Sequence, residues 1–174
     1  KKIDVCAYDI TSSKVNVLVE ERLNTYIEIR KPLFFNNGKE FIHWSEQDGW
    51  AHLYHYDADG KLKGQVTSGP WHVEEIEGFD EKTRTVYFTA NGKETGEDPY
   101  YLHFYKAGLD GSGVKLLNSG DFDHAVVLDD AKKFFINNSS RVNTAPVSVL
   151  YDANGKKIMD LEKADLSALM QSGY

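Results

Sequence analysis

The stretch Asn37-Gly38-Lys39-Glu40-Phe41-Ile42-His43-Trp44-Ser45, with residues 48–57 after it and a second turn at residues 59–60, decides the fold. Runs rich in aromatic and β-branched residues favour strands, and the Asn-Gly and Asp-Gly pairs between them suit the left-handed backbone of tight hairpin turns. The same order of runs and turns returns twice, at a period of roughly 45 to 50 residues. The later copies comprise residues 84–90, 99–106 and 110–111, and then residues 133–137, 147–152 and 154–156.

Each copy is typical of a four-stranded antiparallel sheet, and residues 5–15 have the pattern of the end of an earlier copy. A single sheet of this kind leaves one face uncovered, whereas radial stacking of sheets as propeller blades covers both faces. We therefore predict an all-β fold, a partial β-propeller of about three and a half four-stranded antiparallel blades, which is too few to close a ring and suggests a piece of a larger protein. The expected units are a partial blade at residues 1–24, blades at residues 25–68, 69–118 and 119–160, and a connecting helix at residues 161–172.

A less polar strand opens each unit and is expected to line the central channel of the propeller. These inner strands are predicted at residues 26–30, 71–76 and 122–128. Residues 92–98 form the longest connection and are predicted to be a surface loop. The end of the chain has a different pattern, because Leu166, Leu169 and Met170 have helical spacing, so a short helix is predicted over residues 161–170.

Large apolar residues at comparable points of the second strand are predicted to fill the space between sheets, namely Trp44, Phe88 and Phe135. An open stack of blades also leaves two terminal faces uncovered, and exposed apolar patches of that size usually find a partner. We therefore expect self-association through the first and last blades. The expected participants are Val5, Ala7, Tyr8, Phe135, Val149 and Tyr151.

Composition and charge fit a folded, acidic domain. The 174 residues are 41% apolar and 13% aromatic with a net charge of −7, and the sequence pI is about 5.3. A nucleic-acid-binding protein has a basic footprint, so no nucleic acid is expected as a partner. No apolar run approaches the roughly 18 residues that span a bilayer, and the chain starts at Lys1 without a signal-peptide pattern. Cys6 has no partner for an internal disulfide and is interpreted as a buried structural thiol.

The sequence lacks the motifs that usually support catalysis or cofactor binding. It contains no Gly-x-Ser-x-Gly pentapeptide, no phosphate-binding loop and no Gly-x-Gly-x-x-Gly, and Ser112 between two glycines is interpreted as part of a hairpin loop. No zinc-type spacing connects the histidines, which are interpreted as ordinary strand and turn residues. No catalytic, cofactor-binding or metal-binding residue is therefore predicted, and no cofactor. The six histidines are His43, His52, His55, His72, His103 and His124.

An acidic stretch, Glu74-Glu75 with Glu77 after it, begins on a predicted inner strand. One interpretation is a clamp for a cation or an amine that faces the channel. Successive strand residues point to opposite faces, however, so Glu74 and Glu75 face the channel together only if the strand bulges. The favoured interpretation is therefore a solvated strand end.

The amino-acid sequence of the repeat resembles the propeller domain of the dipeptidyl peptidase IV family over nearly the whole chain. Residues 44–54 contain a Ser-Glu-x-Asp-Gly turn and a His-x-Tyr strand, and residues 65–73 contain Thr-x-Gly-x-Trp-x-Val, in the order that these enzymes show. Residues 96–101 and 140–147 also look like bacterial members of the family. The resemblance places this chain in the last blades before a hydrolase domain.

The resemblance implies a two-part serine peptidase in which a propeller caps an α/β-hydrolase domain that cleaves N-terminal dipeptides after proline. The propeller would limit access and supply part of the substrate site, so the implied partners are the hydrolase domain and a peptide substrate, and this segment would be inactive alone. The glutamate pair that holds the substrate amino terminus belongs to an earlier blade in the family and is not transferred to Glu74-Glu75. Arg30 lies near a stretch that reaches the substrate cavity in some relatives, but its local motif does not match well enough for a role to be assigned.

The resemblance also implies a periplasmic or secreted location. Two overlapping Asn-x-Ser sequons at residues 137–140 have meaning only if the protein passes through a glycosylating pathway. The alternative function is a stand-alone periplasmic propeller scaffold of the TolB type that binds proteins. The coding sequence after Tyr174 discriminates the two, because a Gly-x-Ser-x-Gly about one domain downstream indicates the peptidase.

Overall fold

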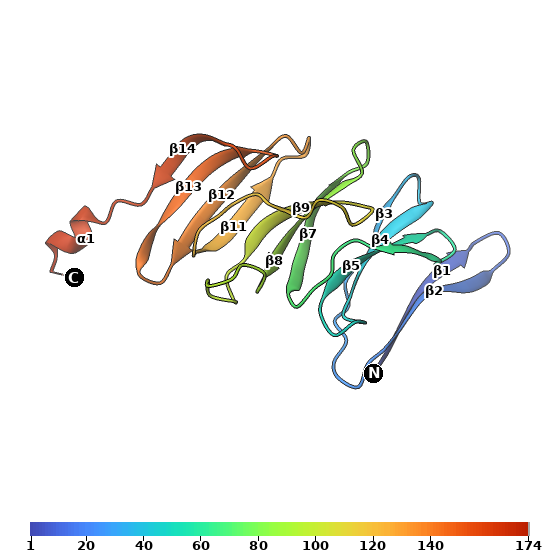
Figure 1. Cartoon of the computed structure of the whole chain (residues 1–174). Helices are drawn as coiled ribbons and strands as arrows, with labels where there is room; N and C mark the ends of the chain where they lie inside the picture. The colour runs from blue at the N-terminus through green and yellow to red at the C-terminus, as the bar shows by residue number, and fades with distance from the viewer. Residues whose placement is uncertain (174) are drawn as a thin grey trace.

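The computed structural model describes residues 1–173 and is nearly all β. Four antiparallel sheets lie side by side along an arc, and the two termini lie at its opposite ends (Figure 1). The first sheet, here called the partial blade, has only two strands, β1 (Lys2–Asp9) and β2 (Lys14–Arg22). This arrangement confirms the predicted fold class.

Three four-stranded sheets follow, each with its strands in sequence order from one edge to the other. Blade A comprises β3 (Leu33–Phe35), β4 (Glu40–Ser45), β5 (His52–Asp57) and β6 (Leu62–Gln65). Blade B comprises β7 (His72–Asp80), β8 (Thr85–Asn91), β9 (His103–Gly108) and β10 (Lys115–Leu116). Blade C comprises β11 (Asp123–Leu128), β12 (Phe134–Arg141), β13 (Thr144–Asp152) and β14 (Lys157–Lys163).

The turn between the third and fourth strands contains a glycine in the same backbone conformation in all three blades. Its glycine has a positive φ of 82° at Gly60, Gly111 and Gly155. A side chain at any of the three would also meet the backbone of the preceding blade, since a Cβ would lie 2.1 Å from a Leu18 atom at Gly60 and 2.7 Å from a Leu117 atom at Gly155. The glycines therefore set both the turn conformation and the close approach of one blade to the next.

Apolar layers fill the three spaces between neighbouring sheets. The predicted core residues lie in them, with Trp44, Phe88 and Phe135 only 5%, 0% and 1% exposed. Trp44 and Phe88 belong to the largest layer, between blades A and B, and Phe135 belongs to the layer between blades B and C. The inner strands β7 and β11 of neighbouring blades are also in contact, as expected where first strands converge.

Three local predictions were wrong. Residues 26–30 are irregular, and the first strand of blade A is the shorter β3. The predicted helix over residues 161–172 is only α1 (Ser167–Gln171), because residues 161–163 continue β14 along β13. Cys6 is exposed rather than buried.

Within residues 1–173, no helix is long and apolar enough to cross a membrane.

The terminal faces carry different residues from those predicted. Val5 and Ala7 pack inward on the layer under blade A, whereas Tyr8 faces outward and is 61% exposed. In blade C, Phe135, Val149 and Tyr151 point toward blade B, and Phe135 stacks on Tyr151 with ring centroids 5.1 Å apart. The outer face of blade C instead presents a cross-strand row of apolar residues, Val127, Ile136, Leu150 and Met159.

Candidate functional site

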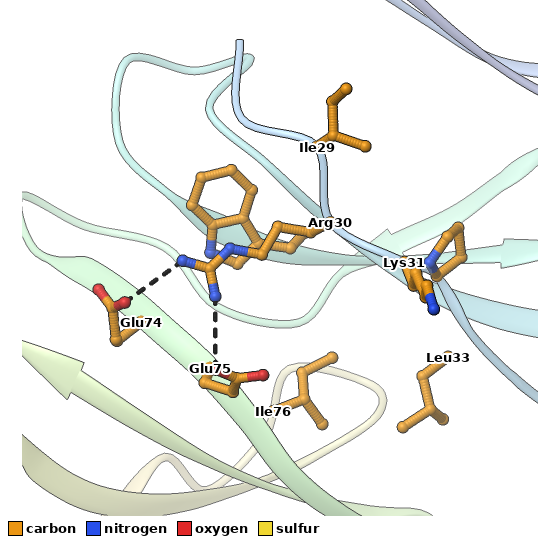
Figure 2. A pocket seen from close by; sticks show the side chains of 9 residues that line it. Ile29, Arg30, Lys31, Leu33, Glu74, Glu75 and Ile76 are labelled. Atoms are coloured by element: carbon orange, nitrogen blue, oxygen red, sulfur yellow. Dashed lines mark hydrogen bonds and ion pairs between the residues drawn. The ribbon is translucent and has the colours of Figure 1, made fainter.

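A cavity of about 500 Å³ opens where the segment before β3 passes the start of β7 (Figure 2). It lies between the first strands of blades A and B, the edge that faces the channel of a propeller. Five of the nine lining side chains are apolar, and Arg30, Glu74 and Glu75 lie together whereas Lys31 lies apart from them (Figure 2). The lining residues are Ile29, Arg30, Lys31, Pro32, Leu33, Trp44, Glu74, Glu75 and Ile76.

Arg30 is held at the centre of this site by contacts on several sides. Its Nη2 lies 2.8 Å from Glu28 Oε1 and 3.3 Å from Glu74 Oε1, and its Nη1 lies 3.7 Å from Glu75 Oε2. The guanidinium carbon lies 4.9 Å from the centroid of the Trp44 ring, within the range of a cation–π contact. The contact with the buried indole and the three carboxylates together restrict the guanidinium, so Arg30 is pre-organised.

Trp44 is itself fixed by blade B. Its indole Nε1 donates a 2.7 Å hydrogen bond to the carbonyl oxygen of Val73, the residue before Glu74. The same short stretch of β7 therefore positions the ring under Arg30 and the carboxylates beside it. This couples the geometry of the site to the packing between blades A and B.

An irregularity in β7 brings both glutamates to Arg30. Val73 pairs with Ala90 and Glu75 pairs with Thr89, so Glu74 is an extra residue with no partner on β8. A bulge of this kind rotates the side chains of adjacent residues toward one side. Figure 2 shows both carboxylates directed at the guanidinium. The pair therefore has features of both interpretations, because a bulge directs both carboxylates at Arg30 and both remain exposed to solvent near the start of the strand, at 41% and 65%.

The cluster has more carboxylates than cations within contact distance, because Glu28, Glu74 and Glu75 surround one guanidinium. Arg30 is the less accessible partner at 19% exposure of its side chain, compared with 41% for Glu74 and 65% for Glu75. The two glutamates are therefore more accessible to a bound molecule than Arg30 is, and the exposed Lys31 lines the same cavity. The arrangement suits recognition of polar or positively charged groups and contains no nucleophile with an adjacent base.

Glu77, the third acidic residue of the stretch, lies outside this cavity. It accepts a hydrogen bond of 3.2 Å from the Thr89 hydroxyl, and burial raises the pKa of its carboxyl above the usual value. A second register shift between Ile76 and Gly78 accompanies this position. Glu77 is thus a partly buried structural residue rather than a solvated one.

The six histidines have separate partners in the structure. His43, His55, His72 and His103 lie 2.6 to 3.3 Å from the carboxylates of Glu21, Glu40, Glu74 and Glu97. His52 contacts the Thr67 hydroxyl and the Gly69 carbonyl, and His124 contacts the Asn137 amide oxygen and the Gly120 carbonyl. Among residues 1–173, no group of three potential metal ligands converges.

The remaining candidate residues lie apart from the cavity. Ser112 is in the turn between β9 and β10, where its backbone N–H bonds the Asp110 side chain. Asn137 is 2% exposed and accepts a hydrogen bond from Asn118, so the first sequon is inaccessible in the folded chain. Asn138 of the second sequon is exposed.

Sequence reasoning noted Arg30 and the glutamates separately and missed their association. It also missed Trp44 as the platform under Arg30, since Trp44 was predicted only as a core residue. The signal available was the pair Glu74-Glu75 on an inner strand, because a bulge there would direct both carboxylates to one side, where a cation is needed to offset their charge.

A stack of four-stranded antiparallel sheets with apolar layers between them defines this chain as a segment of a β-propeller. Over residues 1–146 its sequence matches the family described as the dipeptidyl peptidase IV (DPP IV) N-terminal region. The chain therefore belongs to that family, as the resemblance indicated.

Similar proteins agree with this assignment. The sequence is 44% identical over 55 residues to a dipeptidyl peptidase 4 of Arthroderma otae and 42% identical over 55 residues to one of Trichophyton rubrum. Each match covers 31% of this chain and 7% of the relative. The fold is that of the corresponding part of Porphyromonas gingivalis dipeptidyl peptidase 4, with a TM-score of 0.80 and 24% identity over 98% of this chain and 24% of that one.

Proposed function

We propose that this chain is a non-catalytic part of the propeller that walls the substrate cavity of a serine dipeptidyl peptidase of the DPP IV type. The enzyme would remove N-terminal dipeptides after proline by means of an α/β-hydrolase domain joined to the propeller. Family membership supports the propeller role, and the similar fungal and bacterial proteins are named as dipeptidyl peptidases. The proposal includes a periplasmic or secreted location, for which the only support is the family resemblance.

The observation that carries this function is the placement of Arg30. Arg30 belongs to the segment just before β3, the first strand of blade A. Its guanidinium lies beside β7, the first strand of blade B. A charged group that contacts a buried ring and three carboxylates resists reorientation when a ligand binds. Rigid side chains of this kind hold a substrate in one orientation. Arg30 thus contributes to binding of the substrate rather than to bond cleavage.

The test is made on the full polypeptide expressed from the parent gene, with Gly-Pro p-nitroanilide as substrate. We expect Arg30→Ala to raise KM by roughly tenfold, about the effect of one charge-assisted hydrogen bond, with little change in kcat. Lys39→Ala, an exposed turn residue, is the matched control and leaves both constants unchanged. A parent polypeptide that contains a hydrolase domain but does not cleave the substrate contradicts the proposal.

The isolated chain is proposed to be inactive, because the motifs of a nucleophile and its base are absent from its sequence. Incubation of the purified chain with the same p-nitroanilide checks this directly. Turnover that survives rigorous purification and disappears in Ser112→Ala would show that the chain has its own active site.

The isolated chain is also proposed to self-associate through its two open faces. The partial blade exposes Tyr8, Val15 and Val17 on its outer side, at 61%, 63% and 47%. The outer side of blade C exposes Val127, Ile136 and Met159, at 69%, 42% and 52%. In the parent these two faces would meet neighbouring parts of the same polypeptide.

A further inference from the structure

A second cavity, of about 450 Å³, lies beside the Arg30 cavity and has a different chemistry. Two exposed rings form its rim, Trp50 from the turn before β5 and Tyr100 from the loop before β9. They are 47% and 81% exposed, and Pro70 and Pro99 lie in the same lining. The cavity therefore spans loops of two adjacent blades and is predominantly aromatic and apolar.

Glu74 joins the two cavities, because it lines both of them. Its Oε1 lies 3.3 Å from Arg30 Nη2, and its Oε2 lies 3.3 Å from Nε2 of His72 in the second cavity. One carboxylate, presented by the bulge of β7, thus faces two binding spaces. Glu74, at the start of β7, is the one residue that the linings of the two cavities share.

The second cavity has the features of a groove for a proline-containing peptide. Flat aromatic faces pack well against proline rings, and extended proline-rich segments are generally bound in aromatic-lined grooves. A proline-rich backbone offers carbonyl oxygens but few N–H groups, so its groove needs donors. The Trp50 indole N–H, the Tyr100 hydroxyl and the Asn91 amide supply donors of that kind at the rim and wall.

We propose that this second cavity binds an extended, proline-containing peptide segment that continues from the chain held in the Arg30 cavity. The inference rests on the proposed function, because it takes the Arg30 cavity as part of the substrate site. Trp50 and Tyr100 are then binding residues remote from the bond that is cleaved. They select for substrates whose chain is long enough to reach both cavities.

The chain contains a built-in reporter for this site. It has three tryptophans. Trp44 and Trp71 are 5% and 6% exposed, whereas Trp50 is 47% exposed. Quenching of fluorescence by acrylamide therefore reports mainly on Trp50. An N-acetylated decapeptide of alternating alanine and proline is the probe, because a blocked amino terminus prevents its cleavage as a dipeptidyl peptidase substrate. An N-acetylated decapeptide of alternating glycine and serine is its matched control.

We expect the alanine–proline probe to protect Trp50 from acrylamide and to give a binding isotherm by calorimetry, and the glycine–serine peptide to do neither. Trp50→Ala and Tyr100→Ala should each weaken probe binding by roughly threefold to tenfold, the effect of one lost aromatic contact. Both side chains are exposed, so neither change should disturb folding. Tyr26→Ala removes a ring that is 74% exposed and outside both cavities, and it should leave binding unchanged.

Equal binding of the two decapeptides, or wild-type affinity in both Trp50→Ala and Tyr100→Ala, overturns the proposal. Protection of Trp50 in the full parent polypeptide before any peptide is added also overturns it, since the rest of the polypeptide then occupies the groove. These readouts do not involve catalysis. A parent that binds the probe but cleaves no dipeptide contradicts only the proposed function, and one that cleaves dipeptides without binding the probe contradicts only this inference.

Discussion

Gly60 combines two requirements at one position. Its φ of 82° lies in the left-handed region, and a Cβ there would lie 2.1 Å from the Leu18 carbonyl oxygen of the partial blade. Gly38 is a natural comparison, because its φ is 77° but a Cβ there has no neighbour within 4 Å. Substitution at Gly38 therefore measures backbone strain alone. Substitution at Gly60 measures backbone strain together with the clash between two blades.

We predict that Gly38→Ala costs about 1 to 3 kcal/mol, from backbone strain alone, and that Gly60→Ala costs clearly more. The difference arises because the contact at Gly60 is with backbone, which cannot rotate away as a side chain can. Urea unfolding of the two variants measures it. Equal losses in both variants would show that the partial blade shifts freely and that the contact has no energetic weight.

Glu40 is the most heavily paired carboxylate of the chain as described. Arg84 Nη2 and Lys63 Nζ each lie 2.9 Å from its Oε2, and His55 Nε2 lies 2.6 Å from the same atom. Arg84 belongs to blade B, whereas the other three residues belong to blade A, so the cluster ties two blades together. The Arg84 guanidinium holds the pKa of the Glu40 carboxyl well below its usual value near 4.5.

The sign of the pH dependence follows from that depressed pKa. Glu40 contributes stability that is fully present above about pH 4.5 and is lost as the pH falls toward the folded pKa. We predict that Glu40→Gln lowers the free energy of unfolding at pH 7 and weakens the loss on acidification. Urea midpoints at pH 7, 5 and 3.5 test this, with the exposed Glu162→Gln as control. An acid limb that is unchanged in Glu40→Gln contradicts the assignment.

At the scale of elements, β7 shapes the candidate site more than any other strand. It contains register shifts between Val73 and Glu75 and between Ile76 and Gly78. The first directs Glu74 and Glu75 together at Arg30, and the second accompanies the partly buried Glu77. A regular strand of the same sequence would place one of the two adjacent glutamates on the opposite face, so the site depends on the irregularity.

The terminal helix α1 has the opposite character. It spans five residues, none of them buried, and lacks a side-chain cap. Isolated helices of this length are marginal in water, so α1 is expected to add little to the stability of the blades. We predict that ending the chain after Ala164 changes the free energy of unfolding by less than about 0.5 kcal/mol. A larger loss by urea unfolding would show that α1 packs against the blades in solution.

At the scale of the whole molecule, each junction between sheets combines an apolar layer with polar contacts that involve a buried histidine. His43 and Glu21 lie 2.9 Å apart between the partial blade and blade A. His55 and Glu40 reach Arg84 between blades A and B. His103 lies 2.9 Å from Glu97, and its ring centroid is 4.9 Å from that of His124 in blade C. The contacts that cross a junction are His43 with Glu21, Arg84 with Glu40, and the rings of His103 and His124, and directional polar contacts restrict the relative placement of sheets more than apolar contact alone.

The open faces give a prediction at this same scale. We expect the isolated chain to form oligomers at micromolar concentration, and Ile136→Lys to shift it toward the monomer because a charge then lies in the apolar row of blade C. Val142→Lys is the control, since Val142 is fully exposed in the turn after β12 and lies outside that row. Sedimentation velocity measures the distribution. A wild-type chain that is strictly monomeric contradicts this prediction.

Local chemistry in the sequence was sufficient for much of the architecture. Strand runs between Asn-Gly and Asp-Gly turns depend on neighbours a few residues apart, so the three four-stranded sheets and their order followed from the repeat alone. The burial of Trp44, Phe88 and Phe135 followed as well, because a blade stack has few places for large apolar side chains. The resemblance to the family depended on short sequence motifs in the same repeat.

Only the tertiary structure decided which side of a terminal strand is inside and what meets across blades. Phe134 and Phe135 are adjacent and both apolar, yet register with β13 and packing on blade B bury Phe135 and leave Phe134 44% exposed. The same ambiguity put Cys6 outside when the sequence predicted it inside. A strand with apolar residues on both faces does not specify its own orientation, because a shift of one residue exchanges the faces. The Arg30 site was undetermined for the same reason, since a single bulge at Glu74 joins residues that lie more than forty positions apart.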